Sequence, residues 1–378
     1  MSGYVVVRKE FPLENMEKST KRSLTPDVSR GIAIFLVIWG HVIQQGLYGI
    51  AEVAENVVFK WIYTFHMPLF LLISGFFFYS SVKKKNLKTL VLNRTGDLIK
   101  TLVIWNTVCY GCKLLFLILR EESVTVSVRV WLEEVVMGYW FLWAVLFCTA
   151  IVGLVTKVLP QKLWLVGMIV LAPLVLLSPC RWVILSMYPY FVIGFFFHKF
   201  IDGGRKIASL LKYVVIVLYV VGMLYYFCVP AVGNSEIKNL LDTCIAMIKG
   251  QGSVSDVIYQ VFRTALFYYL GITGGITAIV LIDWLGRKVG ETGVVWIFAQ
   301  MGQYSMQIYI LQRVFVEIIL ANVYRSVTEH MGTGFVERNL FMVAYVYSLF
   351  VSVLCAGVIF VIARYGIRGK LRKVLFGR

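Results

Sequence analysis

The feature that most constrains this chain is a series of apolar runs, each close to the ~20 residues that a helix needs to cross a bilayer. Hydrophobic residues make up 59% of the 378 residues and charged residues 15%, whereas a soluble domain has roughly 45–50% and about 25%. A soluble fold of this length has too little interior to bury so much apolar surface. We therefore expect an all-α polytopic membrane protein, and the same composition excludes a disordered chain or a disulfide scaffold.

The runs predict about ten transmembrane helices. The predicted spans are 31–50, 57–80, 98–119, 138–156, 162–179, 182–200, 210–229, 258–284, 293–320 and 340–363. The first 29 residues are polar and contain no apolar core, so no cleavable signal peptide is expected. The predicted organisation is a cytoplasmic segment at 1–29, a ten-helix membrane domain at 30–365 and a basic cytoplasmic tail at 366–378.

The net charge of +17 has a topological explanation. If the N-terminus is cytoplasmic, the segments facing inside hold 26 of the 37 Lys and Arg residues and those facing outside hold eight. Cytoplasmic loops of membrane proteins are enriched in Lys and Arg. This bias predicts both termini inside and removes the reason to expect a nucleic-acid partner.

Two histidines occupy unusual positions, because ionisable residues inside a membrane are costly and often functional. His41 lies eleven residues after Arg30, about 16 Å into the first span, and His66 lies about 14 Å into the second from the other side. A histidine at this depth can act as a general base that takes a proton from a sugar or lipid hydroxyl attacking an acyl carbonyl. The alternative is a histidine that only bridges helices by hydrogen bonding.

Cationic residues at the cytoplasmic ends of the spans are candidates for binding phosphate. Arg30 opens the first span, and Arg94 and Lys100 belong to a basic patch before the third. These residues could hold coenzyme A phosphates, but Arg30 could also be a positive-inside anchor and the patch could bind anionic lipid headgroups. Further along, Arg313 and Glu317 are four residues apart and are expected to pair on one helix face.

Five motifs in order resemble those of integral-membrane acyltransferase family 3, which includes bacterial O-acetyltransferases and fucose 4-O-acetylase-like proteins. The motifs run from about residue 25 to 365, nearly the whole chain. They are Arg30-Gly-Ile-Ala-Ile-Phe-Leu-Val-Ile-Trp-Gly-His41, Phe65-His66-Met-Pro68-Leu-Phe-Leu-Leu-Ile-Ser74-Gly75-Phe76, Gly138-Tyr139-Trp140-Phe141-Leu142, Tyr190-Phe-Val-Ile-Gly194-Phe and Gly302-Gln-Tyr-Ser305-Met-Gln-Ile-Tyr309-Ile-Leu.

The resemblance implies transfer of an acyl group, usually acetyl, from cytoplasmic acyl-CoA to a hydroxyl, usually on a glycan. It places the catalytic histidine at His41 with Arg30 as its partner. Two departures weaken parts of the assignment. Many members have an Arg-x-x-Arg pair at the third helix, where this chain has Arg94 followed by Asp97, and many end the late motif with His, where this chain has Gln312.

The sequence therefore predicts a membrane O-acyltransferase of a bacterial inner or plasma membrane. His41, His66 and Arg30 are the expected catalytic residues, and Arg30, Arg94 and Lys100 the expected acyl-CoA-binding residues. The expected substrate-binding residues are Tyr139, Trp140, Ser305 and Tyr309, although an aromatic belt or helix packing would also explain them. Acyl-CoA, a glycan or lipid-linked saccharide and membrane lipids are the expected partners, with no tightly bound cofactor and no metal.

Two other classes of function remain open from the sequence. A transporter or flippase for a polyprenol-linked glycan would use His41 to bind substrate or protons and would not consume acyl-CoA. A membrane sensor or non-catalytic partner of a glycan-synthesis complex would tolerate loss of both histidines.

Overall fold

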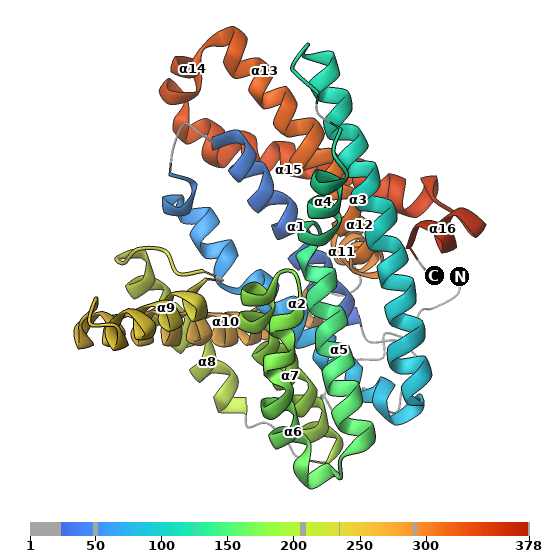
Figure 1. The fold of residues 1–378 in the computed structure, drawn as a ribbon, viewed down its shortest axis with the longest axis vertical. Helices are drawn as coiled ribbons and strands as arrows, with labels where there is room; N and C mark the ends of the chain where they lie inside the picture. The colour runs from blue at the N-terminus through green and yellow to red at the C-terminus, as the bar shows by residue number, and fades with distance from the viewer. Residues whose placement is uncertain are drawn as a thin grey trace, which may run out of the picture.

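A computed structural model describes residues 24–47, 52–124, 126–204, 209–233, 235–289 and 293–376, and all regular elements in these ranges are helical (Figure 1). The α-helices are α1 (Leu24–Leu47), α2 (Val57–Lys84), α3 (Arg94–Leu119), α4 (Val128–Met137), α5 (Trp140–Val158), α6 (Trp164–Leu171), α7 (Arg181–Asp202), α8 (Ser209–Phe227), α9 (Glu236–Ile248), α10 (Val254–Val289), α11 (Gly293–Gln303), α12 (Ser305–Gln312), α13 (Ala321–Met331), α14 (Thr333–Arg338), α15 (Ser348–Val361) and α16 (Gly369–Phe376). Short 3₁₀ elements are η2 (Val53–Glu55), η4 (Gln161–Leu163) and η5 (Ala172–Leu177). The π-helical elements are η3 (Lys88–Asn93), η6 (Arg313–Leu320), η7 (Met342–Tyr347) and η8 (Ile362–Gly366).

Nine helical stretches in the described ranges are long and apolar enough to cross a membrane. This confirms the all-α polytopic membrane protein. The predicted span at 162–179 corresponds to a shorter apolar stretch, Gln161–Leu177, that changes from α6 to the 3₁₀ element η5. Pro173, at the start of η5, has no backbone N–H to continue the α-helix, which explains the change.

The predicted span at 293–320 is wrong in its boundaries. The chain ends α11 at Gln303 and starts α12 at Ser305, and the long apolar stretch is Ser305–Met331. The linking residue, Tyr304, has φ −100° and ψ 11°, outside the helical pattern. Apolar periodicity continues across this break, so hydrophobicity alone could not locate it.

A close crossing of α1 and α11 accompanies the break. A Cβ atom on Gly302 would lie 1.7 Å from the carbonyl oxygen of Asp27, and one on Gly31 would lie 1.9 Å from the carbonyl oxygen of Phe298. Only glycine permits two helix backbones to approach this closely, as at small-residue interfaces of membrane helices. The contact holds α11 across the start of α1, next to Arg30.

A second glycine crossing joins α2 to α7. A Cβ on Gly75 would lie 1.9 Å from the carbonyl oxygen of Phe191, and one on Gly194 would lie 2.0 Å from that of Leu72. Both glycines belong to motifs described above. Their place in the fold is the packing of two helices at the centre of the molecule, which explains why the motifs include glycine at these positions.

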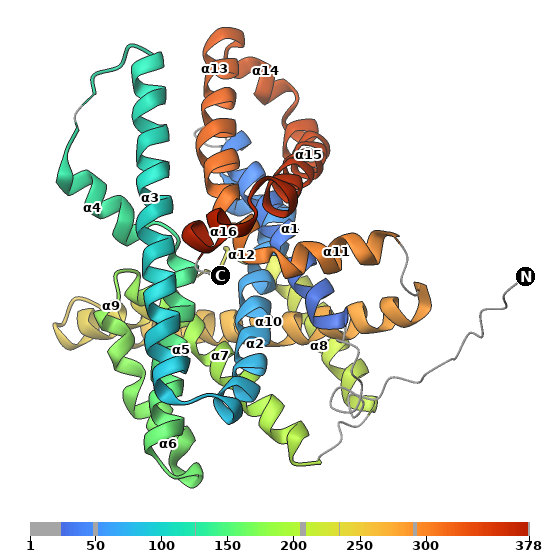
Figure 2. The ribbon, with the colours of Figure 1, turned by 90° about the vertical axis from the view of Figure 1, so that its right-hand side faces the viewer.

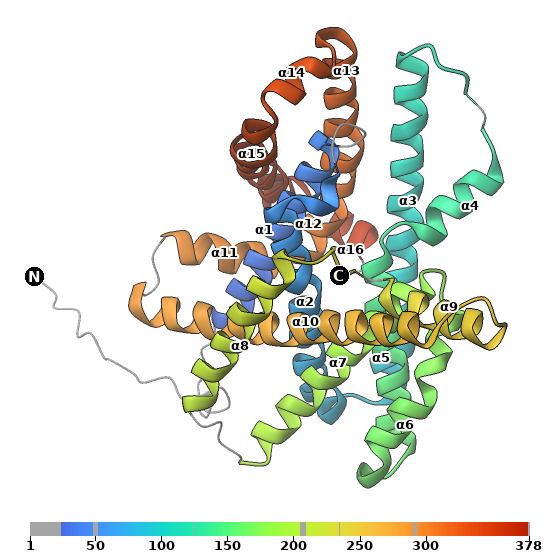
Figure 3. The ribbon, with the colours of Figure 1, turned by 90° about the vertical axis from the view of Figure 1, so that its left-hand side faces the viewer.

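The helices do not form a parallel bundle. In all three views, α10 runs crosswise to α3 and α5 (Figures 1, 2 and 3). The last helix, α16, packs against α3 (Figure 2). The indole nitrogen of Trp105 donates a hydrogen bond to the carbonyl oxygen of Leu375 at 2.8 Å, and its ring stacks on buried Phe376 at 5.4 Å. The segment expected as a basic tail therefore contains a docked helix.

Candidate active site

His41 faces an acidic side chain from a distant part of the chain. Its Nε2 atom lies 3.6 Å from Oε1 of Glu317, which belongs to η6. The two side chains are about a quarter exposed, at 24% and 27%. The other ring nitrogen, Nδ1, is buried and has no hydrogen-bond partner. A carboxylate at this position favours a proton on Nε2, because the other arrangement would direct two acceptors at each other, and Nδ1 then keeps its lone pair.

Glu317 is held by its own helix. The Gln312 amide donates a hydrogen bond to Glu317 Oε1 at 2.9 Å, and Nε of Arg313 lies 3.7 Å from Oε2. The predicted pairing of Arg313 with Glu317 is therefore present. Both residues lie in the π-helical element η6, and π-helical turns inside α-helices occur frequently at functional sites.

Arg313 connects this element to α3 and α4. Its guanidinium donates to Oδ1 of Asn106 at 2.7 Å and to a carboxylate oxygen of Glu134. The second oxygen of Glu134 accepts from Lys113 at 2.8 Å. Asn106 is fully buried and also donates to the carbonyl oxygens of Leu102 and Val135. These hydrogen bonds fix the positions of Arg313, Asn106 and Glu134, because a side chain that left the network would leave an unpaired charge in a low-dielectric interior.

Gly138 leaves space for this network, and Tyr139 after it has an unusual backbone conformation. A Cβ on Gly138 would lie 1.9 Å from Nη1 of Arg313 and 2.0 Å from Oδ1 of Asn106, so only glycine leaves space for their hydrogen bond. Tyr139 has a positive φ of 44° and is held there by a hydrogen bond to the carbonyl oxygen of Ile310 and by the Arg313 guanidinium over its ring. Left-handed backbone at a non-glycine residue persists only where the surroundings enforce it.

His66 lies in the same region but makes different contacts. It is almost fully buried, and its Nδ1 is 2.7 Å from the carbonyl oxygen of Ile62 one turn earlier. Its ring meets the Tyr63 ring edge-to-face at 4.8 Å. Tyr63 packs on Gly40, the residue before His41, where a Cβ would lie 2.8 Å from the tyrosine ring. Tyr63 thus contacts His66 and the residue before His41.

A cavity of about 670 Å³ opens beside this region, bounded by α1, α2, α3, α5, α12 and α16. Its polar lining includes Arg30, Ser74, Lys85, Ser305, Tyr309 and Arg372. The Arg30 guanidinium lies 3.9 Å from the Asp27 carboxylate and 4.9 Å from the centre of the Phe77 ring. The structure therefore places three of the predicted site residues, Arg30, Ser305 and Tyr309, in the lining of one cavity.

Other predicted residues lie elsewhere. Lys100 is exposed and does not line the cavity, and the side chain of Arg94 lies outside the described part of the structure. Trp140 is half-buried against Phe141. Tyr139 is buried, and the centre of its ring lies 5.9 Å from that of the Tyr309 ring. His41 is not among the lining residues. Tyr309 of α12 lines the cavity and Glu317 of η6 faces His41, and η6 directly follows α12 in the chain, so one helical segment connects the cavity to His41.

Sequence reasoning missed several of these residues. Glu317 was expected only as a partner of Arg313, and Tyr63, Asn106 and Glu134 received no role. The available signal was the presence of an acidic side chain within an apolar run, which is costly unless it has a partner. Nothing in the sequence identified His41 as that partner. Within the described ranges, no group of three or more His, Cys, Asp or Glu side chains could hold a metal ion.

Comparison with known proteins identifies the family of the chain. The sequence model of the family described as an acyltransferase domain, acyltransferase family 3, matches residues 24–361. The chain therefore belongs to this family of membrane acyltransferases, and the resemblance drawn from the motifs is confirmed. No solved structure gives a significant match to the chain.

Two curated relatives are nodulation proteins. The chain is 26% identical over 301 residues to nodulation protein NolL of Mesorhizobium japonicum, covering 78% of this chain and 76% of the relative. It is 29% identical over 187 residues to nodulation protein NolL of Sinorhizobium fredii, covering 49% of this chain and 51% of the relative. The protein is thus similar to the first relative over most of its length and to the second over about half.

Proposed function

We propose that this protein transfers an acetyl or other short acyl group from cytoplasmic acyl-CoA to a hydroxyl group of a surface polysaccharide or lipid-linked glycan. The observation that carries the proposal is the approach of His41 to Glu317 on a facing element, 3.6 Å apart, within a member of an acyltransferase family. An imidazole beside a carboxylate is a general base whose tautomer is set and whose protonated form is stabilised.

In the proposed reaction, Nδ1 of His41 takes the proton of the acceptor hydroxyl as its oxygen attacks the acyl carbonyl. The new C–O ester bond forms, the C–S bond of the thioester breaks, and the proton passes to the departing thiolate. Glu317 acts as a positioning residue that stabilises the imidazolium formed during the step. His66 has an assisting or orienting role in this proposal: its ring meets that of Tyr63, and Tyr63 packs on Gly40, the residue before His41.

The donor would occupy the 670 Å³ cavity, where Arg30 and Lys85 provide positive charge. Ser305 and Tyr309 present hydroxyl groups to the same cavity and are the proposed contacts to the acyl chain or acceptor. Arg94 and Lys100 remain predicted donor contacts from the sequence. We place the protein in a bacterial inner or plasma membrane, which supplies acyl-CoA on one side and lipid-linked glycans within reach of the bundle.

The test is mass spectrometry of surface glycan from cells that express the wild type, His41→Ala or no copy of the protein. An acetyl-sized or succinyl-sized increment is expected with the wild type only. Loss of general-base catalysis lowers rates by about 10²–10⁴-fold. Purified protein in lipid nanodiscs, supplied with radiolabelled acetyl-CoA and the extracted glycan, gives the same comparison as a rate.

His330→Ala is the matched control, because His330 is an exposed histidine that bonds only to its own helix, at the carbonyl oxygen of Ser326. It should retain the increment. Identical glycan masses in all strains would exclude glycan acylation. Unmodified glycan that fails to reach the surface without the protein would instead establish a transporter.

A further inference from the structure

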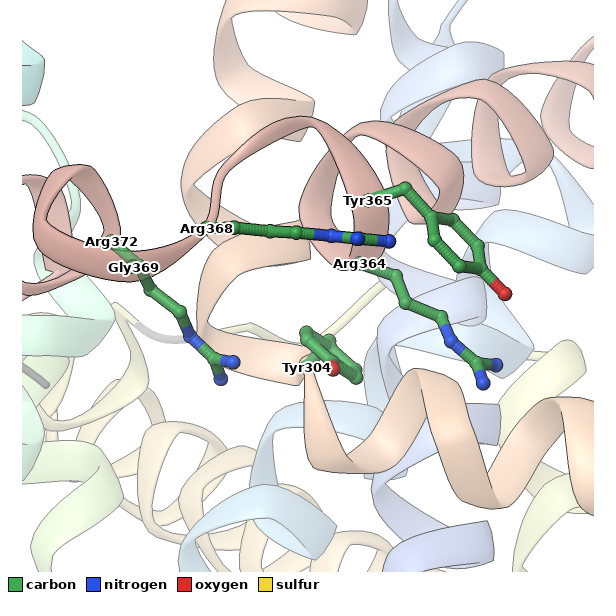
Figure 4. A pocket seen from close by; sticks show the side chains of 6 residues that line it. All are labelled: Tyr304, Arg364, Tyr365, Arg368, Gly369 and Arg372. Carbon is green, nitrogen blue, oxygen red and sulfur yellow. The ribbon is translucent and has the colours of Figure 1, made fainter.

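Three arginines gather around two tyrosines at the end of the last long span. Arg364, Arg368 and Arg372 line a second cavity of about 340 Å³ together with Tyr304 and Tyr365 (Figure 4). In Figure 4 the guanidinium groups of Arg364 and Arg372 lie on either side of Tyr304, and the Arg368 side chain runs toward Tyr365.

The turn between η8 and α16 creates this cluster. Gly369 has a φ of +58°, which glycine adopts without strain, and α16 begins there and carries Arg372 over the Tyr304 ring. Docking of α16 on Trp105, through Phe376 and the carbonyl oxygen of Leu375, fixes the position of Arg372. The cluster is therefore held by packed structure rather than by a loose tail.

In the part of the chain that the structure describes, none of the three arginines forms an ion pair. They rest on aromatic rings instead: Arg364 lies 4.8 Å from the centre of the Trp296 ring and Arg372 4.9 Å from that of Tyr304. One nitrogen of Arg364, Nη1, is buried without a hydrogen-bond partner. A buried guanidinium nitrogen without an acceptor indicates a site for an anionic ligand.

The arginine cluster adjoins the larger cavity. Arg372 lines both cavities, and Tyr304 of the smaller one is followed directly by Ser305 of the larger one. The Gln307 amide, oriented with its oxygen toward α16, accepts a hydrogen bond from Arg372 at 3.2 Å. An elongated ligand can therefore place one end among the arginines and the other end near Arg30.

We propose that Arg364, Arg368 and Arg372 bind the phosphate groups of the acyl donor's nucleotide, with Tyr304 and Tyr365 beside its adenine ring. This inference rests on the proposed function and adds the site where the donor is recognised. Guanidinium groups bind phosphate through paired, charge-assisted hydrogen bonds, and tyrosine rings offer a face for a base. The acyl end of the donor then extends along the large cavity past Arg30.

The phosphate of a lipid headgroup has the same chemistry, so the experiment must separate the two sources. We favour the nucleotide because the cluster is continuous with the cavity that holds Arg30, whereas a headgroup site needs only an exposed basic surface. Lys370 and Lys373 are exposed lysines on α16, the helix that carries Arg372. Neither lines one of these two cavities, so both provide matched charge controls.

The test measures binding of coenzyme A and 3′-dephospho-coenzyme A to the full chain in phosphatidylcholine nanodiscs by titration calorimetry. Arg368→Gln and Arg372→Gln should each weaken coenzyme A binding about tenfold or more, because each removes a charge-assisted hydrogen bond. If an arginine contacts the 3′-phosphate, the variant that lacks it should prefer coenzyme A over 3′-dephospho-coenzyme A less strongly than the wild type does. Lys370→Gln and Lys373→Gln should bind like the wild type.

Thermal unfolding of each variant verifies that it remains folded. If the wild type transfers acyl groups and binds coenzyme A, and the arginine variants bind it equally well, the nucleotide site is wrong while the proposed function stands. If the purified variants instead carry less co-purified phosphatidylglycerol than the wild type and bind coenzyme A with unchanged affinity, the cluster is a lipid site. If the wild type neither binds coenzyme A nor uses acetyl-CoA, the proposed function itself fails.

Discussion

At the scale of single residues, the arrangement around His41 depends on Glu317. The i,i+4 spacing of Arg313 and Glu317 predicted their contact, because neighbours four apart share a helix face. The contacts of Arg313 with Asn106 and Glu134 join residues 207 and 179 positions apart. Local spacing carries no information about such partners. The sequence therefore located the histidine but not the carboxylate beside it.

Substitution of Glu317 by Gln tests its positioning role. The amide keeps the size of the side chain but cannot stabilise an imidazolium as a carboxylate does, so we expect kcat to fall by roughly a hundredfold or more. The KM for acetyl-CoA should change little, because Glu317 does not line the donor cavity. Steady-state kinetics in nanodiscs measure both quantities. A raised KM with unchanged kcat would contradict the role given to Glu317.

At the scale of helices, close crossings decide where the chain bends. Hydrophobic runs predicted most spans to within a few residues, because the bilayer fixes helix length. They failed at 162–179 and 293–320, where Pro173 and the α1–α11 contact interrupt a continuous apolar pattern. The motif glycines Gly31 and Gly302 were read as parts of a catalytic signature, but the structure shows that they also determine helix packing.

Alanine at Gly31 should destabilise the protein, although alanine is the better helix former. The added Cβ would lie 1.9 Å from the carbonyl oxygen of Phe298, and forcing α1 and α11 apart costs about 1–3 kcal/mol. Gly357→Ala in α15 is the matched control, because no atom lies within 4 Å of its Cβ position. Thermal unfolding in detergent should give a lower midpoint for Gly31→Ala only. Equal midpoints would show that the crossing is looser than described.

At the scale of the whole molecule, the distribution of basic residues predicts the orientation in the membrane. The ten spans predicted from the sequence leave 26 Lys and Arg residues on one side and eight on the other, which predicts that both termini lie in the cytoplasm. A fluorescent protein that matures only in the cytoplasm, fused after Arg378, should fluoresce. A fused phosphatase that needs export should be inactive. Phosphatase activity would place the arginine cluster on the side without acyl-CoA.

The membrane class and the order of the motifs followed from composition and spacing, whereas the cavity did not. Arg30, Ser305 and Tyr309 converge because α1 and α12 pack together, and Arg372 joins them from a helix after the last long span. From the sequence alone, the segment that forms this last helix was expected to be a basic tail. Its role in the cavity depends on the left-handed backbone of Gly369 and on the docking of Phe376 against Trp105, and the second of these joins residues far apart in the sequence.

The docked position of α16 has a consequence for biosynthesis. A nascent chain can insert every long span and still lack Arg372 and Phe376, which line the large cavity and follow those spans. Insertion and completion of the cavity are therefore separate events, with the second delayed until residues 369–376 leave the ribosome. A chain interrupted between them would be lodged in the bilayer with its cavity open on one side, and an abundance measurement would count it as normal membrane protein.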